Sequence, residues 1–335
     1  MNNIKDQISK VILLKEQKKL LEAQKILSSI ISKEPNNSLA LLHLGLIEIN
    51  KKNFSNAENY LEKAHIADDQ NIEIITNLGN LYIFAKRLNE AIKIFEIANR
   101  LEPQNEIFLN NLSYLYNENN EKKKSLDMID KGLKINKENF FLLNLQGSIF
   151  VDNNQINKGI SSYQKSIEIK NDFWVSYENL INILETTNKL DLLEKYLNLA
   201  KKNFPEEKIL LILEANYLFR KKDFKNSLQH LKKINLPDDL RNHSNYLVMY
   251  YDLLSKCLER TGDYKKAFIS IVKRNEIKKN LPENVKFEKK IVLNLIQDYK
   301  KYFVKKNIKK FSSNNEILNN KNLTFLVGFP RSGTT

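Results

Sequence analysis

The chain has 335 residues, a net charge of +14 and a single cysteine, Cys257. One cysteine excludes an intrachain disulfide framework and a cysteine-based zinc site, and the four apolar residues at 11–14 are too few for a signal peptide. No stretch approaches the roughly 18 apolar residues of a membrane span, so we expect a cytoplasmic protein. Only 8 glycines and 6 prolines are present, which favours helices over a many-stranded sheet.

From residue 4 to about residue 277 the sequence repeats every 34 residues. Seven units fit without a gap, beginning near residues 4, 38, 72, 106, 140, 174 and 208, and an eighth follows a six-residue insertion near residue 238. One position is small in most units: Ala23, Ala57, Ala91, Ser125, Gly159, Leu193 and Ser227. The position four residues later is bulky: Leu27, Leu61, Phe95, Ile129, Tyr163, Leu197 and Leu231. The apolar spacing predicts two amphipathic helices in each unit.

This pattern resembles the tetratricopeptide repeat, whose unit alternates small and bulky side chains at these positions. The resemblance implies an all-α fold, a right-handed superhelical solenoid of about eight helix-turn-helix units over residues 1–277. No single pair of helices can bury its apolar face alone, so neighbouring units are expected to stack into one continuous core.

By the same resemblance, the first helix of each unit lines a concave face that binds protein or peptide partners. The sixth position of the unit is asparagine at Asn77, Asn111 and Asn179, and we predict these as peptide-binding residues because an amide both donates and accepts hydrogen bonds. In so asparagine-rich a chain, composition alone could also place asparagine there. The second position, where a carboxylate clamp needs lysine or arginine, reads Glu73, Ile107, Phe141 and Val175. We therefore expect no chaperone C-terminus as a ligand.

Residues 278–320 are predicted to form a basic helical bridge. Between Lys273 and Lys310 there are 13 Lys/Arg against 4 Asp/Glu. The apolar residues among the lysines keep a helical period, which favours a helix packed on the array over a nucleic-acid site. We expect neither nucleic acid nor a membrane as a partner, and the sequence leaves the oligomeric state open.

Residues 321–335 are predicted to be a strand followed by an anion-binding loop. The apolar run at 323–327 ends at glycine, and Gly328–Thr335 reads G-x-x-x-x-G-T-T, with Thr334 where a nucleoside triphosphatase carries lysine. An ATPase or kinase is therefore a poor fit. The loop resembles the 5′-phosphosulfate loop of sulfotransferases, whose donor is 3′-phosphoadenosine 5′-phosphosulfate. The resemblance implies that the donor is bound by Arg331, Ser332, Gly333, Thr334 and Thr335.

In that family resemblance Arg331 is also catalytic, because it neutralises charge on the leaving phosphate, and no metal is required. A strand that ends in such a loop needs further strands and helices to fold, so we expect this stub of an α/β sulfotransferase domain to continue beyond Thr335. The 335 residues alone are then expected to be inactive, with the repeats holding an acceptor or partner. The alternative is a non-catalytic tetratricopeptide scaffold. The sequence leaves the sulfuryl acceptor open.

Overall fold

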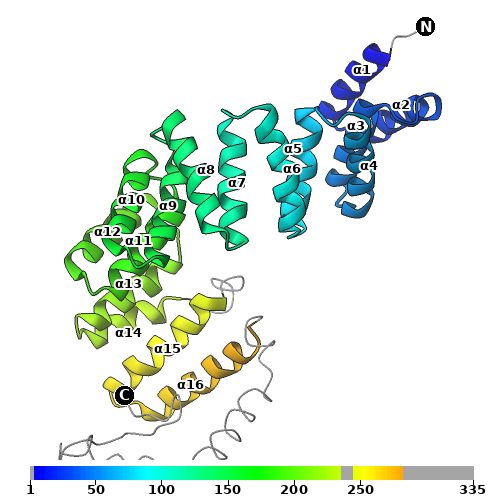
Figure 1. Ribbon diagram of the computed structural model, residues 1–335. Helices are drawn as coiled ribbons and strands as arrows, with labels where there is room; N and C mark the ends of the chain where they lie inside the picture. The colour runs from blue at the N-terminus through cyan, green and yellow to red at the C-terminus, as the bar shows by residue number, and fades with distance from the viewer. Residues whose placement is uncertain (1–3, 235–243, 282–335) are drawn as a thin grey trace, which may run out of the picture. The chain divides into compact units, whose positions relative to one another are not determined.

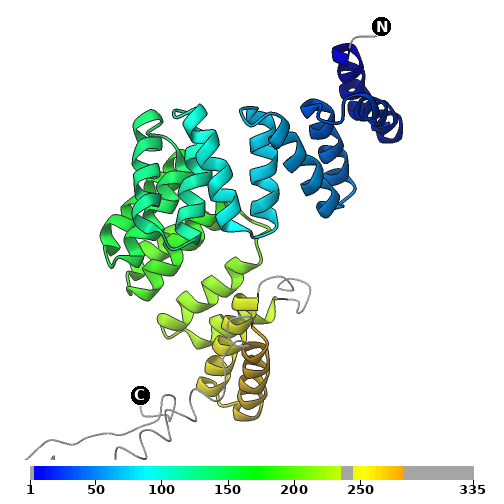
Figure 2. The same cartoon turned by 45° about the vertical axis from the view of Figure 1, so that its right-hand side comes forward.

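The computed structural model describes residues 4–234 and 244–281, and every regular element in these two ranges is an α-helix (Figures 1 and 2). The first eight helices are α1 (Ile4–Glu16), α2 (Leu20–Lys33), α3 (Ser38–Asn50), α4 (Phe54–Ala67), α5 (Ile72–Phe84), α6 (Leu88–Leu101), α7 (Glu106–Glu118) and α8 (Lys122–Ile135). They are followed by α9 (Phe140–Asp152), α10 (Ile156–Ile169), α11 (Trp174–Thr186), α12 (Leu190–Asn203), α13 (Ile209–Arg220), α14 (Phe224–Lys232), α15 (Ser244–Arg260) and α16 (Tyr264–Lys279).

Consecutive helices pair as hairpins, and the hairpins from α1/α2 to α11/α12 stack in chain order (Figure 1). The helices divide between two compact units, one ending at Tyr217 and the other beginning at Leu218. Each unit is described by itself below. The predicted all-helical solenoid is confirmed for the described residues.

Four of the hairpins begin at an asparagine cap that recurs every 34 residues. The side chains of Asn37, Asn71, Asn105 and Asn139 each accept a hydrogen bond from a backbone N–H in the first turn of the helix that follows. These amide oxygens satisfy donors that have no partner inside the helix. The local sequence therefore sets where α3, α5, α7 and α9 start.

The turn inside each hairpin also recurs, because it always contains one residue with left-handed backbone angles. In the first seven hairpins this residue is not glycine: Lys18, Lys52, Lys86, Asn120, Asn154, Asn188 and Lys222, with φ between 55° and 62°. The chain then turns back on the first helix, as where Asn53 N–H donates to the Glu48 carbonyl at 2.9 Å. A non-glycine residue costs about 1–2 kcal/mol in this conformation, which the packing of the two helices must offset.

The core of each hairpin lies where the small and bulky repeat positions meet. Ala57, Leu61, Ala91 and Phe95 are fully buried. Gly79 of α5 lies directly against the Phe95 ring of α6, since a Cβ at residue 79 would fall 2.6 Å from Phe95 Cε2. Close approach of the two helices therefore depends on glycine facing a large side chain, which is why the sequence alternates the two sizes.

Residues 282–335 lie outside the described part of the chain. The predicted strand and loop fall entirely within them, together with most of the predicted basic bridge. The donor-binding predictions at Arg331, Ser332, Gly333, Thr334 and Thr335 therefore stay predictions.

Candidate functional site

The first helices of the third, fourth and sixth hairpins carry a surface that mixes amides with exposed apolar side chains. We call this surface the A-helix face. It comprises Glu73, Asn77, Asn80 and Phe84 on α5, Ile107, Asn111 and Tyr114 on α7, and Val175, Asn179 and Asn182 on α11. Within each helix these residues follow i, i+4, i+7 spacing and so share one side. Between α7 and α11 runs α9, which contacts both.

Several large apolar side chains on this face remain in solvent. Phe84 is 65% exposed, Ile107 59% and Val175 41%. Ile107 and Val175 are two repeat periods apart, so they occupy the same place in their hairpins. The Phe84 ring lies 4.5 Å from the Phe54 ring of α4, whereas Ile107 and Val175 present exposed apolar area among the amides.

The three predicted asparagines differ in how much of their hydrogen-bonding capacity is already used. Asn77 donates from Nδ2 to the Glu73 carbonyl at 2.8 Å within α5. Asn179 donates from Nδ2 to Asn144 Oδ1 at 3.1 Å, which ties α11 to α9. The Asn111 side chain makes no hydrogen bond to any described residue and is half-buried. Asn111 therefore has its whole amide available, whereas Asn77 and Asn179 each keep one N–H and the carbonyl oxygen.

A buried chain of hydrogen bonds lies on α9, α10 and α11, and the repeat pattern did not predict it. Ser176 Oγ lies 3.1 Å from Asn144 Oδ1 and 2.7 Å from Ser166 Oγ, which in turn lies 2.7 Å from the Phe140 carbonyl oxygen, so the two hydroxyl hydrogens are shared among three contacts. Asn144, Ser166 and Ser176 are all buried. The only signal in the sequence is three polar residues at core positions of adjacent helices. Because each group has a partner, the chain joins α9, α10 and α11 in one register.

Tyrosines on α5 and α7 bind carboxylates of the preceding hairpin. Tyr82 donates its hydroxyl to Glu62 Oε1 at 2.7 Å, and Tyr116 donates to Glu96 Oε1 at 2.5 Å, one repeat period later. Lys124 Nζ lies 5.1 Å from the centre of the Tyr116 ring. Burial, reinforced by the neighbouring carboxylate, raises the pKa of both tyrosines well above the ordinary value. These hydroxyls stay protonated and hold neighbouring hairpins together.

A small charged cluster lies on the first helices of the first three hairpins. His43 is 6% exposed, and its Nδ1 lies 3.3 Å from Lys15 Nζ. Burial and the Lys15 charge together lower the pKa of His43 to about 4. Burial also lowers the pKa of Lys15, an effect opposed by Glu73. At neutral pH His43 is therefore uncharged and accepts a hydrogen bond from the lysine.

The cysteine of the chain, Cys257, lies in the core of the described part. Cys257 is fully buried with its Sγ 3.1 Å from Ser227 Oγ, and burial raises the pKa of its thiol, so it is a poor nucleophile. No group of histidine, cysteine and acidic side chains in these ranges could hold a metal ion. None of the described helices has both the length and the apolar character that crossing a bilayer requires.

Two segments of the chain match models of the tetratricopeptide repeat, namely residues 49–110 and residues 142–173. The chain carries tetratricopeptide repeats. The matched segments include α5 to part of α7, and almost all of α9 and α10, so they include Asn77 of the A-helix face and approach Asn111. A comparison with curated proteins found no match.

Two of the solved structures that match the chain resemble it in fold over more than three quarters of its length. A tetratricopeptide repeat protein from Parabacteroides merdae matches at 18% identity and a TM-score of 0.56, over 78% of this chain and 97% of that one. The Cut9–Hcn1 hetero-tetramer of the APC/C matches at 16% identity and a TM-score of 0.54, over 77% of this chain and 49% of the other. At such low identities the likeness extends to the fold alone. The matches support the scaffold alternative, and none of them shows a sulfotransferase domain.

Proposed function

We propose that the tetratricopeptide repeats act as a protein-interaction scaffold and bind an extended peptide segment of a partner along the A-helix face. The single observation that supports this most strongly is the exposed Ile107 beside Asn111, whose amide has no partner among the described residues. An amide can bind the backbone of an extended peptide by donating and accepting at once, while Ile107 contacts an apolar side chain of the same peptide.

The charges of this face restrict the kind of peptide. Glu73 belongs to it, and the three helices that carry it, α5, α7 and α11, contain no lysine or arginine. A terminal carboxylate would meet Glu73 and uncharged amides on these three helices, so we propose that the repeats hold an internal, apolar-containing stretch of the partner rather than its C-terminus.

Peptides selected from a displayed random library against the full chain, then labelled and measured by fluorescence anisotropy, test this proposal. We expect Asn111→Ala to weaken binding about 3- to 10-fold, the value of one hydrogen bond, and Ile107→Ser to weaken it further. The matched control is Asn89→Ala, which removes an exposed asparagine from the second helix of the third hairpin. Selected peptides that bind the Asn111→Ala/Ile107→Ser double variant as tightly as the wild type would contradict the proposal.

The second candidate function is binding of 3′-phosphoadenosine 5′-phosphosulfate for sulfuryl transfer. It rests only on the sequence Gly328–Thr335, in which Arg331 stands inside the loop and Ser332, Thr334 and Thr335 supply hydroxyl donors. No metal is part of this proposal.

Calorimetric titration with 3′-phosphoadenosine 5′-phosphate, using the longest polypeptide that the natural gene encodes, tests this second candidate. We expect saturable binding that Arg331→Ala weakens at least about tenfold, because one charge-assisted contact to the phosphate is lost. Lys300→Ala, a matched removal of one charge in the basic bridge, should leave the affinity unchanged. If the wild type does not bind the nucleotide, the sulfotransferase proposal is wrong and the scaffold proposal alone stays.

A further inference from the structure

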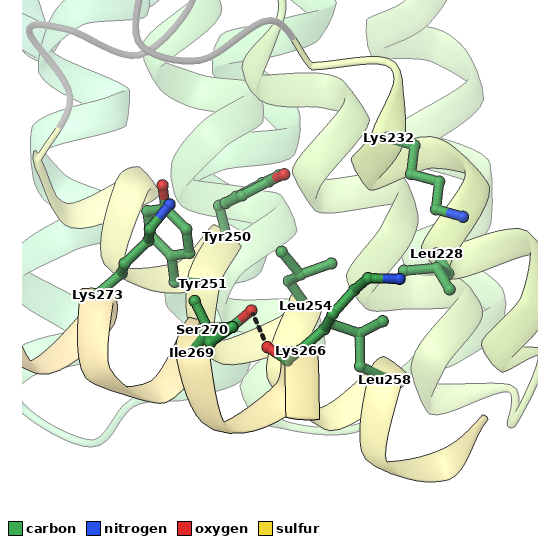
Figure 3. A pocket seen from close by; sticks show the side chains of 10 residues that line it. All are labelled: Leu228, Lys232, Tyr250, Tyr251, Leu254, Leu258, Lys266, Ile269, Ser270 and Lys273. Carbon is green, nitrogen blue, oxygen red and sulfur yellow. Dashed lines mark hydrogen bonds between the residues drawn. The ribbon is translucent and has the colours of Figure 1, made fainter. Parts of the chain in front are cut away.

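The compact part of the chain that begins at Leu218 contains a groove on its surface. It lies between α14, α15 and α16 and has a volume of about 570 Å³ (Figure 3). Leu228, Leu254 and Ile269 are among the residues that make its apolar lining, and Ile269 is 47% exposed. Three lysines, one from α14 and two from α16, line it as well: Lys232, Lys266 and Lys273.

The groove has a physical cause in the repeat sequence. Between the third and fourth hairpins, the equivalent place holds Glu96 hydrogen-bonded to Tyr116, with Lys124 over the tyrosine ring. Four periods after Glu96 the chain has Lys232, and the residues equivalent to Tyr116 and Lys124 are Leu258 and Lys266. The carboxylate and the hydroxyl are thus replaced by an ammonium group and an aliphatic side chain, while Asp263 interacts with both Lys266 and Lys232. The hydrogen bond that joins Glu96 to Tyr116 therefore has no counterpart between Lys232 and Leu258, and the space between α14 and α16 stays open.

The positive charge around the groove is only partly neutralised. Lys266 Nζ lies 2.8 Å from Asp263 Oδ2, whereas Lys232 and Lys273 form no salt bridge with any described residue. At the other end of the groove, Lys273 Nζ lies 5.8 Å from the centre of the Tyr251 ring (Figure 3). Three ammonium groups and one carboxylate therefore surround an apolar lining, which suits a ligand with an apolar side and acidic flanks.

We propose that this groove binds an acidic amphipathic segment of a partner protein, with the apolar side of the segment on Leu254 and Ile269 and its carboxylates on Lys232, Lys266 and Lys273. Charge complementarity decides between the possible occupants. Residues 282–310 of this chain carry nine lysines against three acidic residues, and a second copy of the chain has a net charge of +14. Both would add positive charge to the groove. A flat anionic membrane would meet the lysines but would not reach an apolar lining between three helices.

The test uses the full chain and a fluorescent amphipathic peptide that has leucine at i, i+3, i+4 and i+7 and glutamate at the other positions. Two comparison peptides replace either the glutamates by lysine or the leucines by serine. We expect saturable binding of the acidic amphipathic peptide alone, measured by anisotropy, with affinity that falls as salt is raised. Saturable binding of either comparison peptide at the same affinity would overturn the proposal.

Variants separate the groove from general attraction to a basic protein. Lys232→Glu and Lys266→Glu should each weaken binding at least about fivefold, and Ile269→Ser should weaken it as well. Lys265→Glu makes the same charge change at an exposed neighbour on α16 that does not line the groove, and should change the affinity less than about twofold. Asn111→Ala, on the A-helix face, should have no effect. Equal losses in Lys265→Glu and Lys266→Glu, or an unchanged affinity in Ile269→Ser, would overturn the proposal.

Far-UV circular dichroism shows whether each variant keeps its helices. Should a glutamate variant unfold, Lys232→Gln and Lys266→Gln remove the positive charge without reversing it. Each is then expected to weaken binding of the acidic peptide, by less than the corresponding glutamate variant. Vesicles of phosphatidylserine complete the experiment. If they bind with the same dependence on Lys232 and Ile269 while the acidic peptide does not bind, the ligand is a lipid surface and the proposal is wrong.

Discussion

A methyl group added at Gly79 has no space, because Phe95 of the paired helix already fills it. The new Cβ would lie 2.6 Å from Cε2, 2.8 Å from Cζ and 3.1 Å from Cδ2 of the fully buried Phe95 ring. Carbon atoms pack best at about 3.5–4.0 Å, so either α5 and α6 move apart or the ring leaves its rotamer. Overpacking of this kind costs about 1–3 kcal/mol, and alanine regains about 1 kcal/mol over glycine as a helix former. We therefore expect Gly79→Ala to lower the free energy of unfolding by about 1 kcal/mol.

Urea unfolding followed by far-UV circular dichroism measures this difference. The control is the exposed neighbour Asn80, where Asn80→Ala should be about 1 kcal/mol more stable than Asn80→Gly, since only helix propensity acts there. The double variant Gly79→Ala/Phe95→Leu should lose less stability than the two single variants added together, because leucine leaves room for the methyl group. If Gly79→Ala stabilises the chain as alanine does at residue 80, the argument from close helix approach is refuted.

Two further predictions concern polar side chains, His43 and Tyr116, in the compact part of the chain that ends at Tyr217. The pKa of His43 is about 4 in the folded chain against an ordinary value of 6.5, so the unfolded chain takes up the proton first as the pH falls. Stability should therefore decrease between about pH 6.5 and pH 4, and His43→Gln should flatten that part of the profile of urea midpoint against pH; an unchanged profile would count against it. Tyr116→Phe, which leaves Glu96 without its hydroxyl donor, should lower the free energy of unfolding by about 1 kcal/mol. Tyr114→Phe on the same helix, at 37% exposure, should change it little, and equal losses from both would contradict the role of the pair.

The repeat pattern was sufficient to predict the helical hairpins because the contacts that define one are local. Ala91 and Phe95 lie one turn apart on α6, and Gly79, which packs against Phe95, is only 16 residues before it. The asparagine caps at Asn71 and Asn105 likewise act on backbone N–H groups two or three residues away. Interactions over such short separations depend little on the rest of the fold, so a recurring sequence produces a recurring structure.

The candidate site was predicted less completely. Repeat phase selected Asn77, Asn111 and Asn179 and favoured Asn77 and Asn111 because they lie in adjacent units, whereas the hydrogen bonds distinguish Asn111 from both of the others. The amide of Asn179 is partly used by Asn144, a residue 35 positions earlier, and Asn144 is not at the same phase. Repeat phase predicts which side of a helix a residue occupies, but it does not predict which side chains of a neighbouring hairpin can reach that residue.

By itself, the sequence determined the solenoid of helical hairpins, the excess of positive charge, and the loop motif at 328–335 that supports a sulfate-donor proposal. Only the tertiary structure decided that the Asn111 amide has no partner among the described residues, that Asn144, Ser166 and Ser176 join three helices, and that Lys232 and Lys266 line an open groove. The physical reason is one of distance along the chain. Backbone caps and small-to-bulky packing act within about one hairpin, while the pairing of polar and charged side chains joins residues of different hairpins, up to 35 positions apart, and depends on how each hairpin packs on the next.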